Sequence, residues 1–472
     1  MMRRSIRGGL AAAALLGAVA ALPACALHDA PTIVTLEVLG KRNAPADASW
    51  AAYADGSGAW HALRSSWPGT YEVRPDGLGR YAIAVGCASD PPSVTIFNGT
   101  AEETMTLSAK CELEDEDGCG EEAPAAPAAT SAAALSSSTR DPSVLPEAGA
   151  LLFTVDVTGL PLGERAFTYF HGDPLALDES MGPVYVSMGR DNVLFFTLVG
   201  PESAPGAGKP DPNAVTAWTW ATASSGQPAV HIVAGGEGSN VTAPELATVT
   251  VAGASGDAVT LKATLKLPHA VRVPLGSAEG ETMTYRVIPA EIAAQSEEAS
   301  TMLSAAALEA EDPGAGRSVR SVQVSLAPGA PPVAALALAE TPLAAVERAP
   351  DGTVRWHPYH DAGLGTALAY QLSASVGPET GPTLLWRAAI TPGWLAASGN
   401  RTGTLLYRFP DLGEVAAGEW LIPDGATGTW ELDALLGTLA EGGNIDLGSL
   451  FRGHDVETPG ATQWTVGRAG PM

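Results

Sequence analysis

The sequence contains none of the compact motifs that would identify a serine hydrolase, a nucleotide-binding protein or a helical zinc enzyme. The stretch that begins at Gly253 places a serine as in a G-x-S-x-G elbow but ends in Asp257. The GAGKP stretch at Gly206 lacks the upstream glycine and the Ser/Thr of a phosphate-binding loop. No H-E-x-x-H occurs among the eight histidines. The motifs therefore predict no catalytic residue and no cofactor.

Positive charge is scarce. The chain has 26 Lys and Arg against 52 Asp and Glu, for a formal net charge of −26. Such an acidic protein is repelled by a phosphate backbone, so nucleic acid is excluded as an expected partner. The charge predicts a well-solvated exterior.

Long apolar runs are lacking at the N-terminus as well. The run from Leu10 to Leu22 has 13 residues, whereas a membrane-spanning helix needs about 20. It follows three basic residues, Arg3, Arg4 and Arg7. A basic start before a short apolar segment is typical of a cleaved secretory signal peptide.

The end of that segment, Leu-Pro-Ala-Cys at 22–25, resembles the lipobox of bacterial lipoproteins. The resemblance implies that residues 1–24 are removed, that Cys25 carries lipid (palmitate among its acyl chains), and that residues 25–31 form a tether. The membrane is then a partner through that lipid. Ala26 is not the aspartate that favours inner-membrane retention, so the resemblance favours the outer membrane or the cell surface. The alternative is an ordinary signal peptide with Cys25 as an incidental thiol.

Cysteines are few: Cys87, Cys111 and Cys119 follow Cys25. Cys87 and Cys111 end strand-like segments, so a disulfide between neighbouring strands is plausible in an oxidising compartment. Closing that loop would contribute about 3 kcal/mol in the chain-entropy model. Cys119 is then the unpaired candidate, and pairing of Cys111 with Cys119 is the competing possibility.

What the sequence does contain is a long series of short β-branched or aromatic runs separated by Gly, Pro, Asp and Ser. Asp-Gly pairs at 55–56 and 76–77 predict hairpins in which glycine supplies the positive φ. We therefore predict an all-β, multidomain fold of two to four β-sandwiches, joined by Pro/Ala/acidic linkers.

The predicted boundaries follow changes in composition. The Ala/Glu-rich stretch 296–316 predicts one short helix. The domains are an N-terminal sandwich at 32–112, a linker at 113–149, a middle β region at 150–313 that could divide near 200–213, and a C-terminal sandwich at 318–472 with an insertion at 429–451.

The C-terminal region resembles fibronectin type III and related immunoglobulin-like sandwiches. The resemblance rests on Trp356, Tyr370, Leu412 and Trp420. It implies that Trp356, on the second strand, packs on Tyr370 of the third. Trp420 stands where the corner tyrosine of the family would be. A shared fold of this kind carries no function by itself.

Two groups of residues are weak site candidates. Trp50, Tyr53 and Trp60 could stack on sugars, although aromatics on alternating strands are more often core. The HPYHD stretch holds His357, His360 and Asp361, which could ligate a metal, but Pro358 rules out a helix there.

The favoured function is a non-catalytic binding or structural role of a lipid-anchored cell-envelope protein with an unknown protein or glycan partner. Two alternatives stay open. One is an envelope glycosidase or peptidase whose carboxylates are invisible among 52 acids. The other is an assembly partner that offers a free sheet edge.

Overall fold

The structure is a computed structural model of the whole chain. It describes residues 32–40, 45–55, 58–111, 151–170, 174–188, 193–254, 258–268, 271–293, 296, 299–308, 317–343, 345–377, 383–400, 403–423, 425–438 and 460–472. The chain divides into Met1–Thr32 and Ile33–Met472, and the fold below is that of the second unit. The predicted signal peptide, Cys25, the tether, the linker with Cys119, and residues 439–451 lie outside the described residues.

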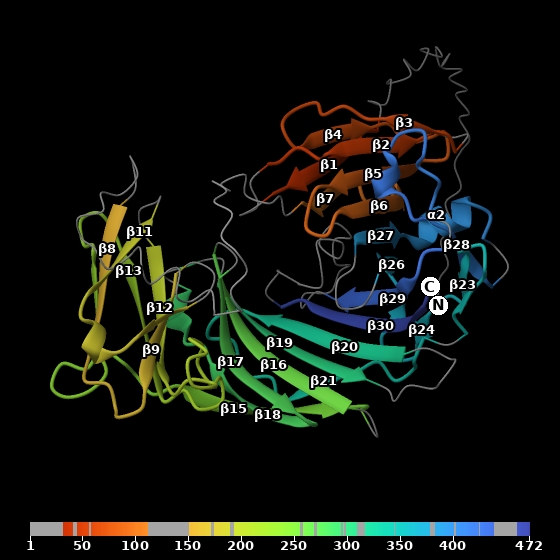
Figure 1. Cartoon of the computed structure of the whole chain (residues 1–472). Helices are drawn as coiled ribbons and strands as arrows, with labels where there is room; N and C mark the ends of the chain where they lie inside the picture. The colour runs from red at the N-terminus through yellow and green to blue at the C-terminus, as the bar shows by residue number, and fades with distance from the viewer. Residues whose placement is uncertain are drawn as a thin grey trace, which may run out of the picture. The chain divides into compact units, whose positions relative to one another are not determined.

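Strands dominate the described residues, and the predicted all-β fold class is confirmed (Figure 1). The first sandwich has two sheets. One holds β1 (Val34–Leu39), β4 (Thr70–Val73) and β7 (Thr106–Lys110) in the order β4-β1-β7. The other holds β2 (Trp50–Ala54), β3 (Trp60–Ala62), β5 (Arg80–Cys87) and β6 (Ser93–Thr100) in the order β3-β2-β5-β6.

Alternation explains the first strand of this sandwich, because Val34, Leu36 and Val38 are fully buried while the residues between them are not. The predicted turn between β4 and β5 forms with a different geometry. Asp76 accepts hydrogen bonds from the backbone N–H groups of Leu78 and Arg80. The positive φ of 74° belongs to Gly79 and not to the glycine that follows Asp76.

The middle region begins with a second sandwich. Its sheets are β10-β9-β12-β13 and β11-β8-β14, formed by β8 (Leu151–Thr158), β9 (Arg165–Tyr169), β10 (Leu175–Leu177), β11 (Val184–Met188), β12 (Val193–Gly200), β13 (Ala217–Ala223) and β14 (Ala229–Val233), with the 3-10 helix η2 (Glu179–Met181). The predicted division near 200–213 is wrong, because β12 and β13 on either side of it pair within one sheet.

A third group of strands follows: β15 (Glu245–Ala252), β16 (Ala258–Leu267), β17 (Val271–Glu279), β18 (Thr282–Val287), β19 (Ser300–Leu308), β20 (Arg317–Leu326) and β21 (Ala335–Ala337), with η3 (Ala290–Ile292). Where a short helix is expected within 296–316, the described residues 300–308 form strand β19. Leu303, Ala305 and Ala307 of β19 point into the core, and β19 pairs with β16 and β20 on its two sides.

The C-terminal strands are β22 (Glu347–Arg348), β23 (Val354–Trp356), β24 (His360–Asp361), β25 (Gly365–Thr366), β26 (Ala369–Val376), β27 (Leu384–Ile390), β28 (Leu405–Tyr407), β29 (Gly428–Thr438) and β30 (Thr462–Pro471), with α2 (Pro392–Ala397) and η4 (Gly418–Trp420). Residues 429–438 of the predicted insertion belong to β29 and pair with β26 and β30, so that part of the prediction is wrong. Trp356 packs edge-on against Tyr370, with ring centroids 5.4 Å apart.

A single twelve-stranded sheet connects these regions, in the order β17-β16-β19-β20-β30-β29-β26-β27-β6-β5-β2-β3 (Figure 1). β20 bridges the predicted boundary at 313–318, because it pairs with β19 and β30. β27 runs parallel to β6 of the N-terminal sandwich over six residue pairs. The sandwiches are thus joined by backbone hydrogen bonds and not only by linkers.

Candidate functional site

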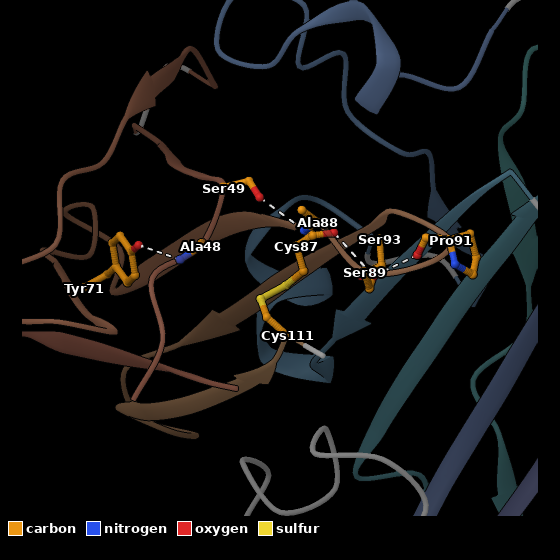
Figure 2. The surroundings of a disulfide bond; sticks show 9 residues. All are labelled: Ala48, Ser49, Tyr71, Cys87, Ala88, Ser89, Pro91, Ser93 and Cys111. Atoms are coloured by element: carbon orange, nitrogen blue, oxygen red, sulfur yellow. Dashed lines mark hydrogen bonds between the residues drawn. A yellow bond between two sulfur atoms is a disulfide. The ribbon is translucent and has the colours of Figure 1, made fainter. Parts of the chain in front are cut away.

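The disulfide joins Cys87 to Cys111, one of the two pairings that the sequence leaves open (Figure 2). Cys87 ends β5 and Cys111 directly follows β7, so the bond ties together the two sheets of the first sandwich. Both residues are at most 1% exposed, and the Cys111 N–H donates to the Leu39 carbonyl at 2.7 Å. Such a buried bond is structural and not a reactive thiol site.

Polar contacts fix the turn beside the disulfide (Figure 2). The Ser49 hydroxyl accepts a hydrogen bond from the Ala88 N–H at 3.1 Å. The Ser89 hydroxyl donates to the Pro91 carbonyl at 2.8 Å and lies 3.0 Å from the Ser93 hydroxyl. Hydrogen bonds with Ser49 and with Ser89 therefore fix the turn between β5 and β6.

The aromatic candidates do not form an exposed platform. Trp50 packs edge-on against Trp420, with ring centroids 6.1 Å apart, and Trp60 contacts the same C-terminal core. Tyr53 is half-buried, 5.5 Å from the ring of His61. Trp50 and Trp60 are half-buried against the C-terminal core, which favours the alternative that they are core residues, and a sugar-stacking role stays a prediction.

The side chains of His357, His360 and Asp361 contact residues of neighbouring loops and strands. His357 donates to the Gly403 carbonyl at 2.7 Å, and His360 lies 3.2 Å from the Thr366 hydroxyl. Asp361 is 1% exposed and accepts backbone N–H groups from residues 340, 341, 363 and 364. Burial alone would raise the pKa of Asp361, but these donors outweigh it and lower the pKa. Asp361 is thus a loop fastener, and no group of three potential metal ligands converges within the described residues.

The strongest perturbed acid is one that sequence reasoning missed. Asp433 of β29 is 4% exposed, and its register partners are Gln371 on β26 and Gly467 on β30. A Cβ at position 467 would overlap the Asp433 carboxylate and lie 3.6 Å from Oε1 of Glu431. Both carboxyl groups therefore share the space above Gly467.

Burial raises the pKa of Asp433 well above its usual value, and the nearby charge of Glu431 raises it further. The pair can hold one proton and one negative charge, which is chemically the arrangement of an acid beside a base or nucleophile. The sequence signal was an acid at alternate positions of an otherwise apolar strand. The prediction of an insertion at 429–451 hides that signal, because it assigns these residues to no strand.

Two further charged residues connect the sandwiches. Glu103 accepts a hydrogen bond from the Gly393 N–H at 2.7 Å and another from the Thr391 hydroxyl, at the N-terminus of α2. Arg80 donates to the Ala397 carbonyl at the other end of α2, at 3.4 Å. Opposite charges at the two ends of a helix complement its dipole. Both side chains come from the first sandwich, so they hold it against the C-terminal region.

Arg286 of β18 performs a similar role in the middle region. It is 3% exposed and donates to the carbonyls of Val215 at 2.6 Å, Leu275 at 3.1 Å and Asn213 at 3.2 Å, and also to that of Pro212. Burial lowers the pKa of the guanidinium, and the charge of Asp211 opposes that shift. Arg286 therefore fastens the β12–β13 loop to the third group of strands.

A small pocket of about 10 Å³ lies in the described part of the chain and is lined by Tyr285, Ile288 and Leu326 among others. That is room for about one water molecule. It does not adjoin the Asp433 pair. Among the helices within the described ranges, none has the length and apolar character needed to cross a membrane.

Comparison with known proteins identifies no family. No family model matches the chain, and no curated protein matches it. Among solved structures the chain is similar to the Bacillus anthracis TIE protein, at 9% identity and a TM-score of 0.14, over 65% of this chain and 49% of that one. The chain thus spans about half the length of that protein. A similarity at this level carries no argument about function.

Proposed function

We propose that this chain is a lipid-anchored cell-envelope protein with a non-catalytic structural or protein-binding role, which it performs as a fused array of β-sandwiches. The proposal rests on one observation: aromatic and charged side chains of this protein contact neighbouring sandwiches. Trp50, Glu103 and Arg286 all hold one sandwich to another. Together with the β6–β27 pairing, they give the array a fixed geometry suited to presenting surfaces.

The resemblance of residues 22–25 to a lipobox supports the anchor in this proposal. The test is metabolic labelling with a palmitate analogue in the wild type and in Cys25→Ser, followed by membrane fractionation. We expect label and membrane association in the wild type and neither in the variant. Label that persists in Cys25→Ser would refute the anchor.

A hydrolytic role is the second candidate, and the Glu431–Asp433 pair is the observation that favours it. A buried acid with a raised pKa beside a second carboxyl group suits glycoside hydrolysis. The test compares the full chain with Asp433→Asn and Glu431→Gln on fluorogenic glycosides. Activity that both variants lose would establish this function, and equal activity in all three proteins would exclude the pair.

A further inference from the structure

Three of the exposed large apolar side chains gather at one end of the first sandwich. Ile33, Leu78 and Met105 are 39%, 68% and 50% exposed. The Met105 carbonyl accepts the Thr35 N–H at 2.8 Å at the start of β1, which places Met105 beside Ile33. We name these three residues the apolar tip.

Leu78 belongs to the same end through the turn that it shares with its neighbours. The Gly79 carbonyl, next to Leu78, accepts the Ala101 N–H at 2.9 Å, and residues 101–104 lead directly into Met105. Val73, which precedes this turn, pairs with Val34 at the start of β1. The apolar tip is thus built from the entry to β1, the β4–β5 turn and the entry to β7.

The same end receives the chain from the predicted anchor. Eight residue steps separate Cys25 from Ile33, and a fully extended chain of that length spans at most roughly 30 Å. If Cys25 carries lipid, the apolar tip is confined to within that distance of the bilayer. The opposite end of the sandwich lies further from the point of attachment, by the length of the strands.

Charges at this end do not oppose contact with a membrane, although the whole chain is acidic. Asp76 is paired with Arg80 at 2.7 Å, and Glu103 is engaged by α2. The exposed ionisable side chains beside the tip include Glu72, Arg74 and Glu102. This end of the sandwich is therefore only mildly acidic, in contrast to the net charge of −26, and a zwitterionic bilayer does not repel it strongly.

From these observations we infer that the apolar tip is a membrane-contacting surface, which inserts into the bilayer interface and orients the sandwich array on the membrane. This inference rests on the proposed anchor at Cys25. Exposed apolar side chains beside a lipid tether gain by burial at the headgroup boundary, and a second contact restricts the rotation that one flexible tether permits.

The test places an environment-sensitive dye on Leu78→Cys in the lipidated full chain with Cys119→Ser, bound to phosphatidylcholine vesicles that contain brominated acyl chains. The matched control is Trp67→Cys, which is 74% exposed in the same sandwich. It precedes Thr70, whose partner Glu37 is near the far end of β1. We expect several-fold stronger quenching at position 78 than at position 67.

The outcomes separate the inference from the proposal beneath it. A chain that does not float with the vesicles overturns the anchor, and this inference with it. A chain that floats but is quenched equally at both positions, or at neither, overturns the inference alone. Emission at position 78 that shifts only with protein concentration, without vesicles, would assign the tip to self-association and also overturn it.

Discussion

The buried guanidinium of Arg286 offers the sharpest test of how the sandwiches are held together. Arg286→Met keeps most of the aliphatic volume but removes the charge and all four hydrogen bonds to carbonyls of residues 212, 213, 215 and 275. A hydrogen bond to a charged group contributes about 1.5–3 kcal/mol by itself. The sum overstates the loss, because the variant no longer has to bury a charge.

We expect Arg286→Met to lower the free energy of unfolding of the middle region by about 2–5 kcal/mol, because carbonyls that lose their donor cost about 1–3 kcal/mol each and the relief from burying the charge offsets part of that cost. The loss of stability should be largest in the segments whose carbonyls accept hydrogen bonds from Arg286. Hydrogen-exchange mass spectrometry should show faster exchange in peptides that cover 210–216 and 271–287, with little change in the first sandwich. Urea unfolding followed by circular dichroism gives the overall loss.

Arg355→Met is the matched control, because Arg355 lies mid-strand in β23 but is exposed. It should change stability by no more than about 0.5 kcal/mol. If the two variants unfold alike, or if exchange at 210–216 is unchanged in Arg286→Met, then Arg286 does not fasten the loop and the reasoning about fused sandwiches fails.

Three other predictions concern single contacts. Gly467→Ala should destabilise the chain by about 1–3 kcal/mol, measured by urea unfolding, because its Cβ displaces the Asp433 carboxylate. Asp433 has a folded-state pKa above its unfolded value. The wild type should therefore lose stability relative to Asp433→Asn as pH rises above about 4, since the folded state holds the extra proton; parallel stability–pH curves would contradict this. Reducing Cys87–Cys111 should lower the unfolding free energy by about 3 kcal/mol, and an unchanged urea midpoint after reduction would refute that.

The local alternation of apolar and polar residues made the fold class predictable. The pairing between strands that are distant in the sequence was not predictable. β1 could be identified from Val34, Leu36 and Val38 alone. β19 could not, because Ala and Ser have no strong preference for strands, and here the neighbouring strands β16 and β20 decide its conformation. The parallel pairing of β27 with β6 joins segments almost 300 residues apart, and no local signal specifies such a contact.

The roles of the candidate site residues also depend on contacts between distant segments, which the sequence does not show. The spacing of Trp50 and Trp60 suits a surface platform as well as a core, and their packing against the C-terminal core, which the sequence does not show, favours the core. The Cys87–Cys111 pairing was within reach of the sequence, because both residues end strand-like segments. The raised pKa of Asp433 could not be predicted, because it comes mainly from burial. β29 pairs with β26 and β30, which lie elsewhere in the sequence.

A single physical constraint links Asp361, Arg286 and Asp433. Burying an ionised group costs several kcal/mol unless hydrogen-bond donors or acceptors surround it. A charged side chain in a strand-rich core must therefore form hydrogen bonds or shift to its neutral form. Asp361 accepts hydrogen bonds from four backbone N–H groups. The two terminal nitrogens of Arg286 donate to four carbonyls, and only its Nε has no partner among the described residues. Asp433 is instead shifted toward its neutral form. This difference makes Asp433 the buried charge whose replacement by a neutral isostere should stabilise the protein at neutral pH, whereas neutralising either of the others should destabilise it.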